Sequence, residues 1–494
     1  MASSGPKKGV VLALASAAQF MVILDVAIVN VALPSIQADL GLSQSALQWI
    51  VVAYGLLLGG FLLLGGRLGD LLGRRKILIA GMTLFTGASL VAGLAESGEL
   101  LIATRAFQGF GAALVAPTAL SILAVTFTEG KERNAALGIY GAVGATSASI
   151  GVIASGLLTD GPGWRWIFFI NIPVGLLLIS LAARFLPADK AHTGSRRFDA
   201  LGAGTVTAGL LLFVYGLNRG VDHGWTSGST VALLAGSLSL LAVFAVIESR
   251  SRSALVPPAT LRNRAMVAAD IAAFLAFGAF FSFIFLGSLM MQQLLAYSPT
   301  RTGVAWLATS LTGFIAAAIA GTRLVTRFGV KKLLVIGMSL LALGVLWLTR
   351  VPVGASYPTD IFPAFLLAGI AIGLSAPTVQ IGALSGVVGS AAGLASGLVE
   401  TMREIGGAVA IAAVSTVLVS RTRDALESAT SNGQQAAAFE GFQSAFVVIV
   451  ALAIAGALIA TFAFPRAHGR VQLADDAAGP GSGVAPAPAL TMRK

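Results

Sequence analysis

The sequence predicts an all-α polytopic membrane protein with fourteen transmembrane helices arranged as two related halves. Of the 494 residues, 56% are hydrophobic and 11% are charged. Apolar runs of roughly 20 residues, the length that a helix needs to cross a bilayer, recur from Gly9 to Phe464 and leave no room for a sizeable soluble domain. Two further observations support the prediction: a short basic segment occurs twice, and lysine and arginine alternate between the loops as membrane topology requires.

The repeated basic segment is the best landmark in the chain. Its first copy is Gly66–Lys76, with the sequence GRLGDLLGRRK, and its second is Thr322–Lys332, with TRLVTRFGVKK. The alignment pairs Gly73 with Gly329 and keeps arginine, leucine and lysine at three further positions. Each copy is expected to be a short loop that makes its flanking helices antiparallel neighbours.

The position of the two copies predicts how the spans are grouped. They follow the second and the tenth of the expected spans, so the repeat offset is eight spans, and two spans are inserted between two sets of six. The expected spans are 10–31, 46–66, 77–95, 100–125, 134–158, 165–186, 199–217, 229–247, 266–293, 302–322, 332–349, 360–384, 392–420 and 442–464. The expected units are an N-terminal six-helix bundle (1–190), two additional helices with their loops (191–264), a C-terminal six-helix bundle (265–465) and a disordered cytoplasmic tail (466–494).

The distribution of basic residues predicts the orientation of the chain. Of its 32 lysines and arginines, 24 fall in loops and termini that the fourteen spans place on one side of the membrane. Because cytoplasmic loops carry an excess of these residues, both termini are expected in the cytoplasm. The net charge of +11 is therefore a feature of membrane topology, and no nucleic-acid partner is expected.

The sequence gives no indication of a metal or of a cofactor. Cysteine is absent, and the three histidines, His192, His223 and His468, fall in separate loops. The first apolar run is too long for a signal peptide and carries Asp25, so it is expected to remain as the first helix.

Ionisable residues inside a membrane are costly and are functional candidates by default. Asp25 lies in the first span, and a carboxylate that faces a cavity can take up a proton on one side and release it on the other. The alternative is a packing residue that is hydrogen-bonded to a neighbouring helix. Arg105 lies in the fourth span with Gln108 on the same helical face. It either tunes such an acid or forms a static structural pair.

The thirteenth span carries the most unusual group of charges. Glu400, Arg403, Glu404 and Gly407 lie on one face by helical spacing, and the span must bury Glu400 at least in part to reach across the bilayer. Pairing of Arg403 with one glutamate neutralises two charges and leaves one net negative charge. Facing a cavity, this group would favour cationic substrates or add a proton site.

Further candidates are weaker. The fifth span has a seam of small residues, including Gly144 and Gly151, that lets helices approach closely and is a candidate for gating. Asn30 and Gln292 are secondary candidates for polar contacts to a ligand. Asp270 lies near the start of the ninth span, where a snorkelling or helix-start role is the simpler interpretation.

Together these segments resemble the major facilitator superfamily, and within it the fourteen-span drug:proton antiporter family of the EmrB/QacA type. The similarity covers nearly the whole chain. It rests on four segments: Leu24–Pro34, Gly66–Lys76, Arg105–Gly111, and Trp164–Gly175 with the sequence WRWIFFINIPVG.

The resemblance implies two six-helix bundles around a cavity that opens alternately to each side. Asp25 would couple protons or sense substrate, Arg105 would assist proton transfer, and Asp70 would hold one conformation through contacts with the other half. The conformational segment would comprise Gly66, Asp70, Gly73 and Arg74. The chain departs from the family pattern at Val152, which replaces a proline after Gly151, and at Thr326, which stands where the first copy has Asp70.

These observations predict a proton-coupled exporter of amphipathic drugs or antibiotics, with cationic compounds as one option, in a bacterial inner membrane. It is expected to be monomeric, to contact the lipid bilayer, and to need no cofactor beyond the proton gradient. The alternative is a dedicated exporter of one endogenous metabolite, such as an antibiotic, an amino acid or a siderophore. A membrane receptor or enzyme is a remote alternative, since the chain shows neither a catalytic cluster nor a sensor domain.

Overall fold

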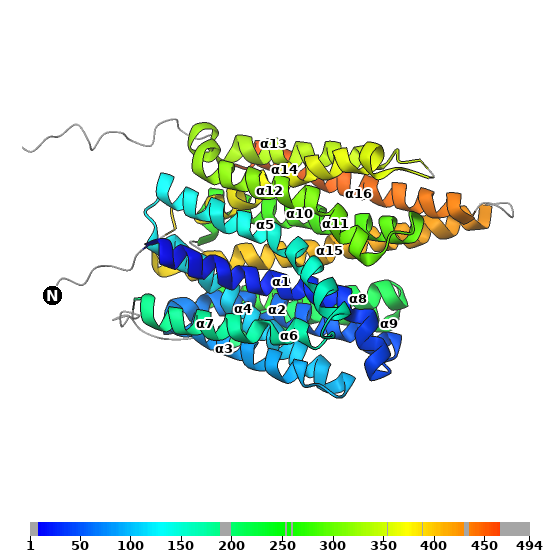
Figure 1. Ribbon diagram of the computed structural model, residues 1–494. Helices are drawn as coiled ribbons and strands as arrows, with labels where there is room; N and C mark the ends of the chain where they lie inside the picture. Colours follow the sequence, from blue (N-terminus) through cyan, green and yellow to red (C-terminus); the bar gives the residue numbers. More distant parts are fainter. Residues whose placement is uncertain are drawn as a thin grey trace, which may run out of the picture.

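The computed structural model describes residues 8–187, 199–251, 254–257, 260–352, 354–387, 389–428 and 434–464. These residues form helices and their connections (Figure 1). The tail expected at 466–494, and the residues 191–198 of the expected inserted unit, lie outside the described residues.

Helices lie within all fourteen ranges expected from the sequence. The first half contains α1 (Lys8–Leu40), α2 (Gln44–Leu72), α3 (Arg74–Gly93), α4 (Gly98–Thr126), α5 (Lys131–Asp160), α6 (Trp166–Phe169) and α7 (Asn171–Phe185). It is followed by α8 (Ala200–His223) and α9 (Gly228–Arg250). The second half contains α10 (Arg264–Leu289), α11 (Pro299–Ala305), α12 (Leu307–Ile319), α13 (Val325–Leu348), α14 (Phe362–Ala383), α15 (Ala392–Ser428) and α16 (Gln434–Phe462).

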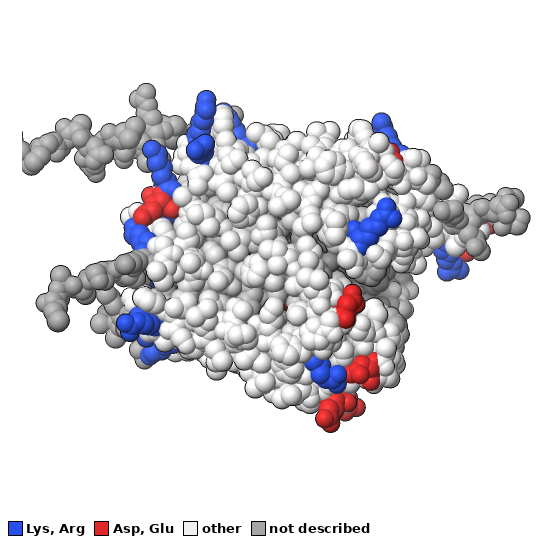
Figure 2. Space-filling model, in the orientation of Figure 1, with Lys and Arg blue, Asp and Glu red and all other residues white. Residues whose placement is uncertain are grey.

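The molecule has the surface of a membrane protein. Among the described residues, 12 helical stretches are long and apolar enough to cross a membrane. One of them, Thr300–Leu348, has 49 residues and contains a non-helical glycine, Gly329, so it covers two of the expected spans. Figure 2 shows charged side chains gathered at the two ends of the bundle, with an uncharged band between them.

The two copies of the basic segment turn at their aligned glycines. Gly73 has φ 107° and Gly329 has φ 77°, values that favour glycine because a side chain would be strained there. The expected loops are wrong in extent, since α2 continues to Leu72 and α3 begins at Arg74. A helix satisfies its own backbone hydrogen bonds, and leucine and arginine are good helix formers. The chain therefore stays helical up to Leu72 and again from Arg74, and it turns only at the glycine between them.

One end of the bundle, called the basic end here, contains the start of α1 and the turns at Gly73 and Gly329. At this end the halves approach to backbone contact in two places. A Cβ on Gly66 of α2 would lie 2.2 Å from the carbonyl oxygen of Gly393 in α15. A Cβ on Gly321, in the π-helical turn Ala320–Leu324 after α12, would lie 2.3 Å from Cα of Gly138 in α5.

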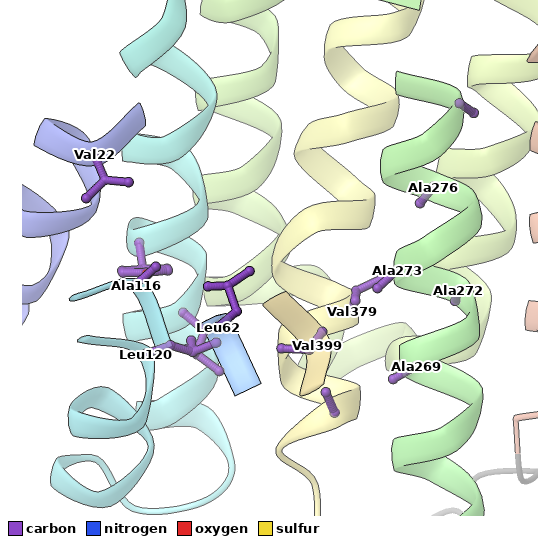
Figure 3. Close-up of a cluster of buried hydrophobic side chains, with 14 of the residues drawn as sticks. Val22, Leu62, Ala116, Leu120, Ala269, Ala272, Ala273, Ala276, Val379 and Val399 are labelled. Carbon is purple, nitrogen blue, oxygen red and sulfur yellow. The ribbon is translucent and has the colours of Figure 1, made fainter. Parts of the chain in front are cut away.

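Apolar side chains continue this contact into the bundle. Figure 3 shows Leu62 of α2 and Val399 of α15 side by side, with alanines of α10 on the far side of α15. Leu62 and Val399 are both buried. The interface between the halves is therefore tightly packed near the basic end.

The additional helix α8 packs against both halves, and α9 packs on α8. The Trp49 ring of α2 lies 5.7 Å from the Tyr215 ring of α8. On the other half, the indole of Trp225 donates a 2.8 Å hydrogen bond to Thr416 Oγ1 of α15. The division of the chain into four units stays a prediction.

We expect Gly321→Val to separate the halves at the basic end, because a side chain at this position meets backbone atoms that cannot move aside. The chain lacks cysteine, so spin labels on Lys131→Cys and Arg327→Cys can report the distance between α5 and α13 by pulsed electron resonance. Gly87→Val is the matched control, since a Cβ on Gly87 meets nothing within 4 Å. Equal distance distributions in both variants would contradict the close-contact interpretation.

Candidate functional site

A cavity with a volume of about 680 Å³ lies between the two halves. This size suits a drug-sized organic molecule. Helices α1 and α5 of the first half and α10, α12, α14 and α15 of the second half contribute to its wall. Five aromatic side chains lie on the second-half side: Phe277, Phe280, Phe281, Phe285 and Trp306.

The cavity extends away from the basic end. On α1 its lining runs from Gln19 to Pro34, a rise of about 22 Å at 1.5 Å per residue. Asn30 and Gln292, both exposed, line its outer part. The basic end is closed below it by the packed glycines of α2, α5, α15 and the π-helical turn after α12, so the cavity faces the opposite end.

A buried polar cluster stands behind this wall in the first half. Arg105 Nη1 of α4 lies 2.5 Å from Asp25 Oδ2 of α1, and Arg105 also donates to Gln108 Oε1 at 2.9 Å. The other carboxylate oxygen, Asp25 Oδ1, accepts from Gln108 Nε2 at 3.2 Å and from Asn171 Nδ2 at 2.9 Å. Gln108 further donates to Ser89 Oγ at 2.8 Å.

The arginine of this cluster is held on its other faces as well. Arg105 Nε donates to the carbonyl oxygen of Ile50 at 3.3 Å, and its guanidinium carbon lies 4.2 Å from the centre of the Tyr54 ring. Asp25 is 0% and Arg105 2% exposed. Two opposite charges with this many hydrogen bonds are the form in which ions persist in a low-dielectric interior.

The structure corrects one sequence expectation for this cluster. Asp25, Arg105 and Gln108 are not among the residues that line the cavity; the lining side chains of α1 are neighbours such as Val22 and Val26. Asp25 points instead toward α4 and α7, where the hydrogen-bonding groups are. Sequence reasoning missed Asn171 and Ser89 as partners, although Asn171 lies within the segment WRWIFFINIPVG.

The second charged group lies on α15, as its spacing predicts. Arg403 contacts both acids: Nη1 lies 2.5 Å from Glu400 Oε2, and Nη2 lies 2.9 Å from Glu404 Oε1. Glu400 is 1% exposed and lies behind the wall, whereas Arg403 and Glu404 line the cavity. One arginine between two carboxylates leaves the group with one net negative charge.

Asp70 joins the halves at the basic end. Its carboxylate accepts hydrogen bonds from the backbone N–H groups of Gly393 (3.0 Å) and Leu394 (2.9 Å) at the start of α15. Arg74 lies 2.6 Å from Asp70 and also donates to the carbonyl oxygen of Gly389. An acid at a helix N-terminus is stabilised by the helix dipole, so these contacts form a latch between the halves.

The glycines of α5 have different surroundings. Gly144 lines the cavity. A Cβ on Gly151 would lie 2.9 Å from Ala27 Cβ, so Gly151 provides close packing of α5 on α1 within one half. The gating role of both residues stays a prediction.

The snorkelling interpretation of Asp270 is wrong. Asp270 is 8% exposed, and its Oδ1 has no hydrogen-bond partner among the described residues. The helix start at Arg264 lies nearly two turns away, so the side chain is inside the bundle rather than at its end.

Comparison with known proteins agrees with this architecture. The family model for the Major Facilitator Superfamily matches residues 15–411 and 270–493. The puromycin resistance protein pur8 of Streptomyces alboniger is 36% identical over 464 residues, which cover 93% of this chain and 91% of that protein. The cephamycin export protein CmcT of Amycolatopsis lactamdurans is 36% identical over 413 residues, which cover 83% of this chain and 85% of that protein.

Solved structures show the same fold. The crystal structure of the human organic anion transporter MFSD10 matches with a TM-score of 0.63 at 15% sequence identity. The match covers 92% of this chain and 100% of that one.

We expect Arg105→Met to destabilise the protein strongly, by about 3–5 kcal/mol, because it leaves the Asp25 carboxylate buried without its partner charge. The double variant Asp25→Asn/Arg105→Met should recover much of this loss, since both charges are then removed. Thermal unfolding of the purified proteins measures both effects. Arg423→Met removes an exposed arginine paired with Glu427 and is the control. Additive losses in the double variant would refute a buried ion pair.

Proposed function

The chain belongs to the major facilitator superfamily, and from this premise we propose that it exports amphipathic drugs or antibiotics in exchange for protons. The chain is a multi-pass membrane protein and a transporter rather than an enzyme. The observation that carries the proposal is the cavity of about 680 Å³ between the halves, which has aromatic walls and a closed basic end. Two relatives named for antibiotic resistance and antibiotic export support the substrate class.

The proposed topology has fourteen spans, with both termini in the cytoplasm of a bacterial cell. The stretch Thr300–Leu348 supplies two spans because it turns at Gly329, and the 30-residue helix α5 supplies another. The positive-inside rule places the basic end in the cytoplasm. On this assignment the cavity faces outward, and the chain is of the fourteen-span drug:proton antiporter type.

Asp25 is the proposed proton site. A proton on Asp25 would remove the negative charge that balances Arg105, and an unbalanced buried cation is costly. The pair would then rearrange, and with it α1, whose other face lines the cavity through Val22, Ile23 and Val26. Proton and substrate thereby compete without touching the same atom, and each lowers the affinity of the other.

Alternating access requires the basic end to open. The latch at Asp70 and the glycine contacts would then separate, and the same cavity would become accessible from the cytoplasm. The partners of the protein are therefore small organic substrates, protons and the lipid bilayer. We propose a monomer that needs no cofactor and binds no nucleic acid.

A second candidate function is the export of one endogenous compound. The two relatives are each named for a single antibiotic, puromycin or cephamycin. Transport of one compound, with no competition from unrelated amphipathic molecules, would favour this function over multidrug export.

We expect everted membrane vesicles that contain the wild-type protein to accumulate ethidium when a proton gradient is imposed. Asp25→Asn should reduce this accumulation at least about tenfold, because the proton site is lost. Glu400→Gln tests the second acid, and Glu427→Gln, an exposed acid on the same helix, is the control. Accumulation that persists after an uncoupler collapses the gradient would rule out proton coupling.

We expect Asp70→Asn to slow transport several-fold while it leaves the equilibrium affinity for ethidium nearly unchanged. The substitution weakens the bonds to Gly393 and Leu394 but lies outside the cavity. Thr326→Ala is the matched control, because Thr326 occupies the equivalent position of the second copy and bonds to Arg323 of its own helical segment. A large loss of affinity in Asp70→Asn would contradict the latch.

A further inference from the structure

The closed end of the cavity carries polar groups that neither the proton site nor the latch uses. Gln19 of α1, Tyr140 of α5 and Gln380 of α14 line it together with Arg403 and Glu404 of α15. The three uncharged side chains are 2%, 1% and 5% exposed, respectively. Tyr140 lies two residues from Gly138 on α5, so this group is about half a helical turn further into the bundle than the glycine contact that closes the basic end.

One polar atom of each of these three side chains lacks a hydrogen-bond partner among the described residues. Gln19 Oε1, Gln380 Oε1 and the Tyr140 hydroxyl have no hydrogen bond to any part of the chain that the structure describes. A buried acceptor without a donor is unfavourable, and native proteins rarely leave one so. Three such groups in the wall of one cavity indicate a ligand that brings N–H or O–H donors.

The charge of the site selects a cation. Arg403 and Glu404 are the charged residues among the described lining, and Arg403 is already engaged by Glu400 and Glu404. The group has one net negative charge, and a second cation beside Glu404 would balance it. An anion would meet two carboxylates around an arginine whose charge is already compensated.

Aromatic side chains complete the site. The Arg403 guanidinium carbon lies 5.5 Å from the centre of the Phe277 ring, and Phe277 and Phe281 pack edge to face with their centres 5.7 Å apart. Both rings line the cavity. Their faces suit the apolar body of a ligand and also attract a cation.

We propose that the closed end of the cavity binds a protonated amine that carries N–H groups, attached to an aromatic or apolar body. The ammonium group is balanced by Glu404 and donates to the amide oxygens of Gln19 and Gln380, while Tyr140 offers a further hydrogen bond. This inference rests on the proposed export function and specifies its substrate class. A quaternary ammonium ion has the charge but no N–H, so it leaves both glutamine oxygens unpaired.

Three matched probes test the site: dansylcadaverine, which has a primary amine, its trimethylammonium derivative and its neutral N-acetyl derivative. Binding is measured by dansyl fluorescence with the full chain in lipid nanodiscs, after subtraction of empty nanodiscs. We expect the wild type to bind dansylcadaverine at least about tenfold more tightly than either derivative, as expected for charge-assisted hydrogen bonds.

Variants separate the charge from the hydrogen bonds. Glu404→Gln should weaken binding of both cationic probes to the level of the neutral one. The double variant Gln19→Leu/Gln380→Leu should abolish the preference for the primary amine over the trimethylammonium derivative. Both cationic probes should still bind more tightly than the neutral probe. Glu427→Gln and Gln48→Leu are the controls, since both side chains are exposed and lie outside this cavity. Glu404→Asp keeps the charge and serves as the second variant if Glu404→Gln does not fold.

The outcomes distinguish this inference from the proposed function. Equal affinity of the wild type for the three probes, together with gradient-driven ethidium accumulation in vesicles, would overturn the amine site and leave export in place. An unchanged preference in the Gln19→Leu/Gln380→Leu variant would also overturn it. Absence of binding by all three probes and of any transport would overturn both.

Discussion

The cost of a charge in an interior without water determines how this protein is built. The two buried charged groups beside the cavity are each paired within their own half: Asp25 with Arg105 in the first half, and Arg403 with two glutamates in the second. The polar bonds described between the two halves, such as those of Asp70 to α15 and of Arg133 to the carbonyl oxygen of Leu384, lie at the basic end. The halves can therefore move relative to each other without exposing an unpaired buried ion.

The closure of the basic end combines two kinds of contact with different physics. Between α2 and α15 the backbones meet at Gly66, and the Asp70 carboxylate caps the helix start. Between α5 and the turn after α12 the contact is Gly138 against Gly321, and the second copy has Thr326 in place of the acid. Both sides combine packing with hydrogen bonds, since Arg133 of α5 donates to the carbonyl oxygen of Leu384, but the buried acid lies on the first side. The repeat has preserved the close approach and the turn, while the latch exists in the first copy.

Some of these features could be predicted from the sequence because they depend on local spacing. The turn at Gly329 follows from its alignment with Gly73, and the meeting of Arg403 with Glu400 and Glu404 follows from positions on one helix. The direction of Asp25 could not be predicted, because its partners Arg105 and Asn171 lie on helices that are distant in the sequence. The polar residues Gln19 and Asn30 of α1 line the cavity, whereas Asp25 does not. The presence of Gln19 and Gln380 in the wall of one cavity could not be predicted either, because it depends on how α1 and α14 pack.

Tyr54 of α2 connects the Asp25–Arg105 pair with the wall of the cavity. The Arg105 guanidinium carbon lies 4.2 Å from the centre of the Tyr54 ring. The Tyr54 hydroxyl donates to the carbonyl oxygen of Val22, a residue that lines the cavity. In the proposed mechanism a proton on Asp25 changes the charge balance on one face of α1, while the substrate contacts the other face. A cation at Glu404 and a proton on Asp25 add charge of the same sign to the same region. Because repulsion between like charges is strong where water is excluded, each disfavours the other, and the exchange of substrate for protons follows without a shared binding atom.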